Sequence, residues 1–192
     1  MGAFYTMFFF WFSSSFIYGQ NISEKWYSVH ESNGVTIQNS YPKGGPYKGP
    51  TTEHFNYSYL VFYSRIINET DNTMILNIDF SSESFPIPNS PDTYVKLFLP
   101  DETMTLDKQS SFSYGITELE SLDHSTSYQN KLNPGDDCLY YVVAIFYQTK
   151  ADAWQQERGG NRAEFMLKGN QLFFNMMPQV NAMPCGQVSF NK

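Results

Sequence analysis

The chain has 192 residues, 41% of them hydrophobic, and a net charge of -7 from 12 Lys and Arg against 19 Asp and Glu. The acidic balance and the scattered basic residues argue against nucleic acid as a partner, because phosphate backbones are bound by clustered positive charge. The length suits one domain with a substantial hydrophobic core rather than two.

The N-terminal segment carries no charged side chain before Glu24, and the stretch from Ala3 to Phe12 is almost wholly apolar and aromatic. This pattern, followed by the small polar residues Ser13–Ser15 and by Gly19 as the last residue before a cut, resembles a secretory leader, and it is shorter than a membrane-spanning helix. We therefore expect a cleavable signal peptide over 1–19 and a single domain over 20–192. The product would be exported to the periplasm, the cell surface or the extracellular space, with a membrane contact only if the leader is retained.

The first predicted element of the mature chain is a β-hairpin. Asn33-Gly34 separates two strand-like runs, Trp26–Ser32 and Val35–Ser40, and this dipeptide favours a tight hairpin turn, in which both turn residues have positive φ. The proline- and glycine-rich stretch 42–50 is then predicted to be a loop or an edge crossing.

A second pair of strands is predicted over Phe55–Ile67 and Thr73–Phe80, joined as a hairpin by the polar residues 68–72. Apolar residues alternate along the second of these strands, which predicts one buried face and one wet face. The residues of the predicted buried face are Met74, Leu76, Ile78 and Phe80.

The middle of the chain contains two further predicted strands. Thr93–Leu99 has apolar residues at alternate positions and lies between two prolines, which predicts a strand. The stretch 101–131 is predicted to be strand and irregular loop. Asp137–Tyr147 is apolar on both faces, which is typical of a strand at the centre of a sheet that is covered on both sides.

A closing hairpin is predicted from Ala163–Lys168 and Gln171–Met176, with the rest of the chain as a tail. The two cysteines, Cys138 and Cys185, are predicted to form a disulfide, because an even count in an exported protein favours pairing. Such a bridge would contribute roughly 4 kcal/mol by loop-closure entropy. Two unpaired thiols are the alternative.

The turn Leu132-Asn133-Pro134-Gly135 resembles the approach to strand F in fibronectin type III and related immunoglobulin-like domains. In that family the hydroxyl of a tyrosine near this turn forms a hydrogen bond back to the chain and fixes the corner. Here Cys138 occupies the expected position, and Tyr140 lies two residues further on the same face. The resemblance implies an all-β, antiparallel, two-sheet immunoglobulin-like sandwich of about seven to nine strands. The leader, the size and the single sandwich are also similar to uncharacterised exported proteins of bacteria.

The residues that usually carry catalysis or metal binding are sparse. His30, His54 and His124 are far apart and form no short ligand spacing, and no nucleophile elbow or phosphate-binding loop is present. We expect no metal, no cofactor and no enzymatic activity. A hydrolase with a carboxylate pair from distant segments stays open as the third hypothesis.

The first binding hypothesis concerns the polar connection 149–162, which contains Trp154, Arg158 and Arg162. Immunoglobulin-like folds place recognition residues in the corresponding loop, and a tryptophan near two arginines is typical of an interaction hot spot. We therefore predict a module that binds a protein or surface partner. The alternative is that Trp154 covers a sheet edge and the arginines only solubilise it. The sequence leaves the oligomeric state open.

The second binding hypothesis concerns Tyr57, Tyr59 and Tyr63, which alternate along one predicted strand. If these rings are exposed, they could stack on sugars, as in carbohydrate-binding modules; if they point inward, they are core. N-glycosylation sequons begin at Asn21, Asn56 and Asn68, and their use would require a eukaryotic source. Asn68, in the predicted hairpin turn, is expected to be the most accessible of the three.

Overall fold

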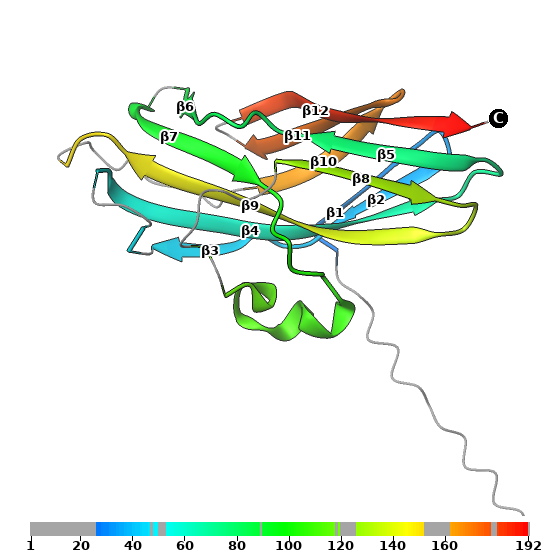
Figure 1. The fold of residues 1–192 in the computed structure, drawn as a ribbon, viewed down its shortest axis with the longest axis horizontal. Helices are drawn as coiled ribbons and strands as arrows, with labels where there is room; N and C mark the ends of the chain where they lie inside the picture. Colours follow the sequence, from blue (N-terminus) through cyan, green and yellow to red (C-terminus); the bar gives the residue numbers. More distant parts are fainter. Residues whose placement is uncertain are drawn as a thin grey trace, which may run out of the picture.

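The computed structural model describes residues 26–46, 48–49, 53–88, 90–117, 119, 126–151, 162–177 and 180–191. These residues form an all-β structure of two antiparallel sheets, one of them curled (Figure 1). They contain twelve strands, more than the seven to nine expected. No helix in this part of the chain combines the length and the apolar character that a membrane crossing needs.

The first sheet has the strand order β1-β2-β4-β9-β7-β6, and β3 also pairs with β4. The long strand β4 pairs with β3 along its first half and with β2 along its second half. The strands are β1 (Ser28–Ser32), β2 (Val35–Asn39), β3 (Lys43–Pro46), β4 (Phe55–Asn68), β6 (Phe85–Ile87), β7 (Ser90–Phe98) and β9 (Asp137–Gln148).

The second sheet has the strand order β10-β11-β12-β5-β8. Figure 1 shows it as a second layer beside the first sheet. Its strands are β5 (Thr73–Asp79), β8 (Ser127–Leu132), β10 (Arg162–Lys168), β11 (Gln171–Met177) and β12 (Val180–Asn191).

The main core lies between the two sheets and is rich in aromatic rings. The ring centroids of Phe62 on β4 and Phe165 on β10 are 5.8 Å apart, and Phe174 on β11 packs against both. The predicted apolar face of the strand at 73–80 is confirmed, since its four apolar residues are all buried in this core. The β-rich architecture of two packed sheets fits a β-sandwich.

A second apolar cluster covers the opposite face of the first sheet. The segment after β7 supplies its cover through two short 3₁₀ turns, η1 (Leu106–Ser110) and η2 (Phe112–Gly115), which lie below β4 in Figure 1. Strand β9 is therefore buried on both faces between β4 and β7, as its apolar sequence predicted.

Two predicted hairpins are confirmed. β1 and β2 pair across Asn33 and Gly34, which have φ of 53° and 73°, as a tight hairpin turn requires. β10 and β11 pair across 169–170. The described residues of the proline-rich stretch 42–50 form one strand, the short edge strand β3.

The predicted hairpin between 55–67 and 73–80 is wrong, because β4 and β5 belong to different sheets. Asn68 sits at the crossing point and is fully buried. Its Nδ2 donates to the main-chain oxygens of Asn72 at 2.8 Å and Leu132 at 3.0 Å, and its Oδ1 accepts from Thr70. Asn68 is therefore not the accessible sequon that the turn prediction implied.

The predicted C-terminal tail is also wrong, because these residues form β12, a central strand of the second sheet. Pro184 obscured the strand pattern, since proline is rare inside central strands. Here the pairing shifts beside it, so that Leu172 faces Gly186 and Phe173 faces Pro184, which leaves Cys185 as the extra residue of a bulge. Gly186 is needed because an added Cβ would lie 2.1 Å from the main-chain oxygen of Asn77.

Candidate functional site

The 149–162 connection leaves the first sheet at the end of β9 and enters the second sheet at β10. Thr149 N donates to the main-chain oxygen of Asp92 at 3.0 Å, and Lys150 Nζ lies 2.9 Å from the Asp92 carboxylate. These contacts attach the start of the connection to β7. Arg162, its last residue, begins β10 and is exposed, whereas Trp154 and Arg158 lie outside the described residues.

Aromatic side chains gather beside the start of this connection. The rings of His54 and Tyr147 stack with centroids 4.3 Å apart, and Tyr94 stacks on Tyr147 at 5.7 Å. Phe55, whose Cα pairs with that of Gln148, is 41% exposed.

Tyr57, Tyr59 and Tyr63 are buried, each less than 10% exposed, in the apolar cluster beneath η1 and η2. The hydroxyl of Tyr59 lies 2.6 Å from Ser113 Oγ, and Tyr63 packs edge-on against Tyr114 at 4.9 Å. The structure thus places these rings inward, so they form no exposed surface for stacking on sugars.

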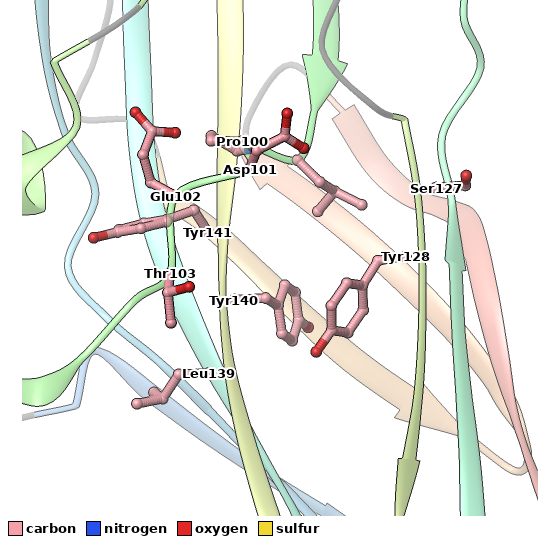
Figure 2. Close-up of a pocket in the computed structure, with 10 residues that line it drawn as sticks. Pro100, Asp101, Glu102, Thr103, Ser127, Tyr128, Leu139, Tyr140 and Tyr141 are labelled. Carbon is pink, nitrogen blue, oxygen red and sulfur yellow. The ribbon is translucent and has the colours of Figure 1, made fainter.

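A cavity of about 280 Å³ lies where the two sheets separate, between β8 and the first half of β9. β7 pairs with β9 only as far as Phe98 and Val143, so beyond that point the only described strand that pairs with β9 is β4. Figure 2 shows Tyr128 of β8 and Tyr140 of β9 side by side at this opening, their ring centroids 5.8 Å apart. The segment after β7 completes the wall.

Carboxylates give this cavity a negative character. Asp101 is exposed at its rim, and Glu102 Oε1 is buried without a hydrogen-bond partner among the described residues. Burial first, and the charges of Glu102 and Asp107 second, raise the pKa of Tyr141 to about 12. Figure 2 shows the Glu102 carboxylate on the same side of β9 as Tyr141, whereas Tyr128 and Tyr140 lie on the other side.

Tyr140 lies two residues beyond the position where immunoglobulin-like domains carry the corner tyrosine. Its side chain is buried, and its hydroxyl has no hydrogen-bond partner within the described part of the chain; the nearby Ser64 hydroxyl instead donates to Asn39 Oδ1 at 2.7 Å. Burial first, and the neighbouring thiols of Cys138 and Cys185 second, raise the pKa of Tyr140.

The predicted disulfide is wrong: Cys138 and Cys185 are both free and buried. Cys138 faces Tyr128 on β8, whereas Cys185 lies on β12 and its Sγ approaches the main-chain oxygen of Leu172 at 3.6 Å. The two thiols lie on strands of different sheets, Cys138 on β9 and Cys185 on β12, and they are not near enough to form a bridge. Burial raises the pKa of Cys138 to about 11 and that of Cys185 further.

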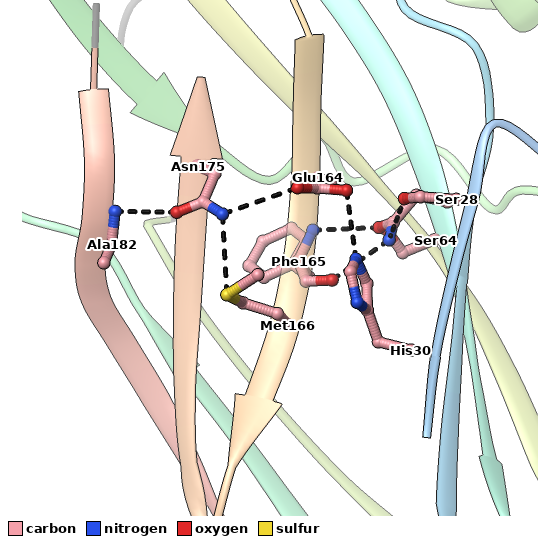
Figure 3. Close-up of polar contacts among 9 residues, drawn as sticks. Ser28, His30, Ser64, Glu164, Phe165, Met166, Asn175 and Ala182 are labelled. Atoms are coloured by element: carbon pink, nitrogen blue, oxygen red, sulfur yellow. Dashed lines mark hydrogen bonds and ion pairs between the residues drawn. The ribbon is translucent and has the colours of Figure 1, made fainter. Parts of the chain in front are cut away.

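A polar network joins the sheets on the side away from the cavity (Figure 3). His30 Nε2 lies 3.0 Å from Glu164 Oε2, and Asn175 Nδ2 donates to Glu164 Oε1 at 3.5 Å. Burial favours a higher pKa for Glu164, but hydrogen bonds from His30 and Ser28, with the charge of His30, outweigh it and lower that pKa. In the described residues, no group of three acidic, His or Cys side chains could hold a metal ion.

Comparison of the chain with protein-family models, with curated proteins and with solved structures finds no match. The site geometry is therefore the basis for any assignment of function.

Sequence reasoning missed the cavity between β8 and β9. Its lining comes from three distant segments, 99–103, 127–128 and 139–141. Asp101 and Glu102 lie in the stretch whose structure the sequence did not define. A pair of adjacent acidic residues directly after a strand and a proline was the only local signal.

Proposed function

We propose that this chain is an exported, non-enzymatic binding module of the immunoglobulin-like sandwich type, which recognises a protein or surface partner with the end of the molecule that carries the 149–162 connection. The observation that supports it best is the exposed Phe55 beside the stacked rings of His54, Tyr147 and Tyr94 at the start of that connection. Exposed aromatic residues beside a long connection are typical of recognition surfaces.

The arrangement of the strands also favours this end of the molecule. Phe55 and Thr93 both pair with Gln148, so β4, β9 and β7 present their ends together beside the connection. A rigid sheet end that supports a long loop is a common way to hold binding residues. Trp154, Arg158 and Arg162 would then extend the aromatic surface with an indole and two guanidinium groups.

The test is binding of the fluorescently labelled, leader-free protein to cells of its source organism. We expect saturable binding that falls at least about tenfold in Trp154→Ala and in Phe55→Ser, since buried aromatic anchors carry much of the binding energy of an interface. Val29→Ser is the matched control, because Val29 is 49% exposed on β1, away from this end.

Pretreatment of the cells identifies the chemistry of the partner. Loss of binding after protease, but not after periodate, supports a protein partner; loss after periodate supports the carbohydrate-binding alternative. Binding that the Trp154 and Phe55 variants leave unchanged, or equal loss in Val29→Ser, would contradict the role of this end. Hydrolysis of cell-surface material by the wild type would favour the hydrolase hypothesis instead.

A further inference from the structure

Two of the N-glycosylation sequons lie on the same strand, and the fold places their acceptor residues in opposite surroundings. The motifs occupy 56–58 and 68–70, whereas Asn21, which begins the third, lies outside the described residues. Asn56 is exposed near the start of β4, and Asn68, at the end of β4, is fully buried. An acceptor for a bulky glycan has to lie at the surface of the folded protein. Burial therefore distinguishes two motifs that are equivalent in sequence.

A β-bulge accounts for the exposure of Asn56. The pairing of β4 with β9 shifts between Phe55 and Ser58, so that two residues of β4, Asn56 and Tyr57, lie opposite one residue of β9. Regular alternation would place Asn56 on the same face as Ser58, which is buried. The bulge changes the direction of the side chains, and Asn56 takes a φ of 49°, a left-handed conformation that asparagine tolerates better than most residues.

The side-chain amide of Asn56 can carry a sugar without losing its hydrogen bond. A primary amide has two N–H donors, and Asn56 Nδ2 donates to Gln148 Oε1. Attachment of a sugar replaces one hydrogen of this nitrogen, and the second remains available to donate to Gln148. The contact between β4 and β9 is therefore compatible with the modification.

The side-chain amide of Asn68 has no hydrogen to spare. Its Nδ2 donates to the main-chain oxygens of Asn72 at 2.8 Å and Leu132 at 3.0 Å. A sugar on this nitrogen would remove one of the two bonds, and it would need room beside a side chain that is 0% exposed. Because a buried carbonyl without a donor is costly, a chain with a glycan on Asn68 would not reach this fold.

We propose that Asn56, and not Asn68, is the N-glycosylation site of the folded protein when the chain passes through a eukaryotic secretory pathway. This inference rests on the export that the proposed function includes. The donor is a lipid-linked oligosaccharyl diphosphate. The bond between C1 of its first sugar and the diphosphate oxygen breaks, and a bond from C1 to Asn56 Nδ2 forms. The amide proton passes to a base of the transferase, the diphosphate leaves on the lipid, and nothing is oxidised or reduced.

A glycan on Asn56 would border the end of the molecule that we assign to recognition. Asn56 follows the exposed Phe55, and its amide reaches Gln148, the last residue of β9 before the 149–162 connection. Figure 1 shows the start of β4 and the end of β9 at the same end of the first sheet. The glycan would thus shield the β4 side of this end and leave the other sides for a partner.

The experiment is expression of the full chain, leader included, in cultured mammalian cells, followed by mapping of the sites in the secreted product. Peptide N-glycanase in H₂¹⁸O converts each glycosylated Asn to labelled Asp, which mass spectrometry of tryptic peptides detects. We expect label on Asn56 in most secreted molecules and none on Asn68. Trypsin places the three sequons on different peptides, because it cuts after Lys25, Lys48, Arg65 and Lys96.

Two equivalent substitutions connect the glycan to this residue. Asn56→Asp removes the acceptor amide and keeps a residue type that tolerates positive φ, so the intact mass should fall by one glycan. Asn33→Asp is the matched control, because Asn33 is also exposed, has a φ of 53° and begins no sequon. Its secreted product should carry every glycan of the wild type.

Three results would overturn the proposal: label on Asn68 in the secreted protein, Asn56 unlabelled in most secreted molecules, or loss of a glycan in Asn33→Asp. If the native leader does not direct export, the same mapping is done with an established secretory leader in place of residues 1–19. Label on Asn56 in that product supports the site although export by the native leader, and with it the proposed function, has failed. An unlabelled Asn56 in that product overturns the site.

Discussion

The side-chain amide of Asn39 on β2 bonds to both backbone groups of Phe165 on β10. Its Nδ2 donates to the Phe165 oxygen at 3.0 Å, and its Oδ1 accepts from the Phe165 N–H at 2.9 Å. The Asn39 amide thus forms the two hydrogen bonds that a neighbouring strand would otherwise form with β10, the outer strand of the second sheet. With the His30–Glu164 contact beside it (Figure 3), it joins the sheets on one side, while the β8–β9 side remains open.

The first prediction concerns this bridge. Asn39→Ala removes the hydrogen-bond partners of the buried main-chain N–H and oxygen of Phe165. It should destabilise the protein by about 3 kcal/mol, because each buried backbone group left without a partner costs on the order of 1–3 kcal/mol. Urea unfolding followed by tyrosine fluorescence measures the change. Asn72→Ala is the control, since Asn72 is exposed, and should lie within about 0.5 kcal/mol of wild type. A similar small effect for Asn39→Ala would show that the bridge does not hold the sheets together.

The second prediction concerns pH. Because the folded-state pKa of Glu164 is lowered below its ordinary 4.5, the stability that it contributes is present above about pH 4.5 and is lost as pH falls through the folded value. Glu164→Gln should therefore cost about 1 kcal/mol at pH 6, the upper range for a partly exposed pair, and less at pH 3. Urea unfolding between pH 3 and 7 tests this, with Glu31→Gln as the charge-matched control. A cost of Glu164→Gln that stays constant with pH would contradict the assigned role of the carboxylate.

The third prediction concerns the thiols. Burial of Cys138 and Cys185, with raised pKa values, should make both nearly inert to iodoacetamide at pH 8, because the thiolate is the reactive form. Intact mass should show no alkylation of the native protein and two additions in denaturant without a reductant. An unmodified chain in denaturant that becomes reactive only after reduction would establish a disulfide and contradict the structure.

The fourth prediction uses two adjacent glycines of β3. A Cβ on Gly44 would lie 2.2 Å from the main-chain oxygen of Tyr59, whereas a Cβ on Gly45 would meet nothing within 4 Å. Gly44→Ala should therefore destabilise the protein by about 2 kcal/mol, typical of overpacking, and Gly45→Ala should be neutral or slightly stabilising. Thermal unfolding of the two variants in parallel measures the difference. Equal effects would indicate that β3 does not pack against β4 as closely as described.

Local patterns predicted the elements that depend on local rules. Asn33-Gly34 marked its hairpin because its turn needs two positive φ values, and the apolar run of β9 marked a strand covered on both faces. The same rules failed for the connection between β4 and β5 and for the strand β12. A five-residue polar link can close a hairpin or cross between sheets with equal ease, and the strand pattern of β12 is interrupted by Pro184 at a bulge.

The candidate sites also divide into features that local sequence predicts and features that long-range packing sets. The sequence by itself determined a β-rich chain, an acidic surface and the positions of its main apolar strands, because periodicity and turn chemistry act between near neighbours. Only the tertiary structure decided that Tyr57, Tyr59 and Tyr63 point inward, that the two cysteines stay apart, and that Glu102 and Tyr128 line one cavity. These properties depend on which strands lie side by side and which sheets face each other, and long-range packing rather than local spacing sets both.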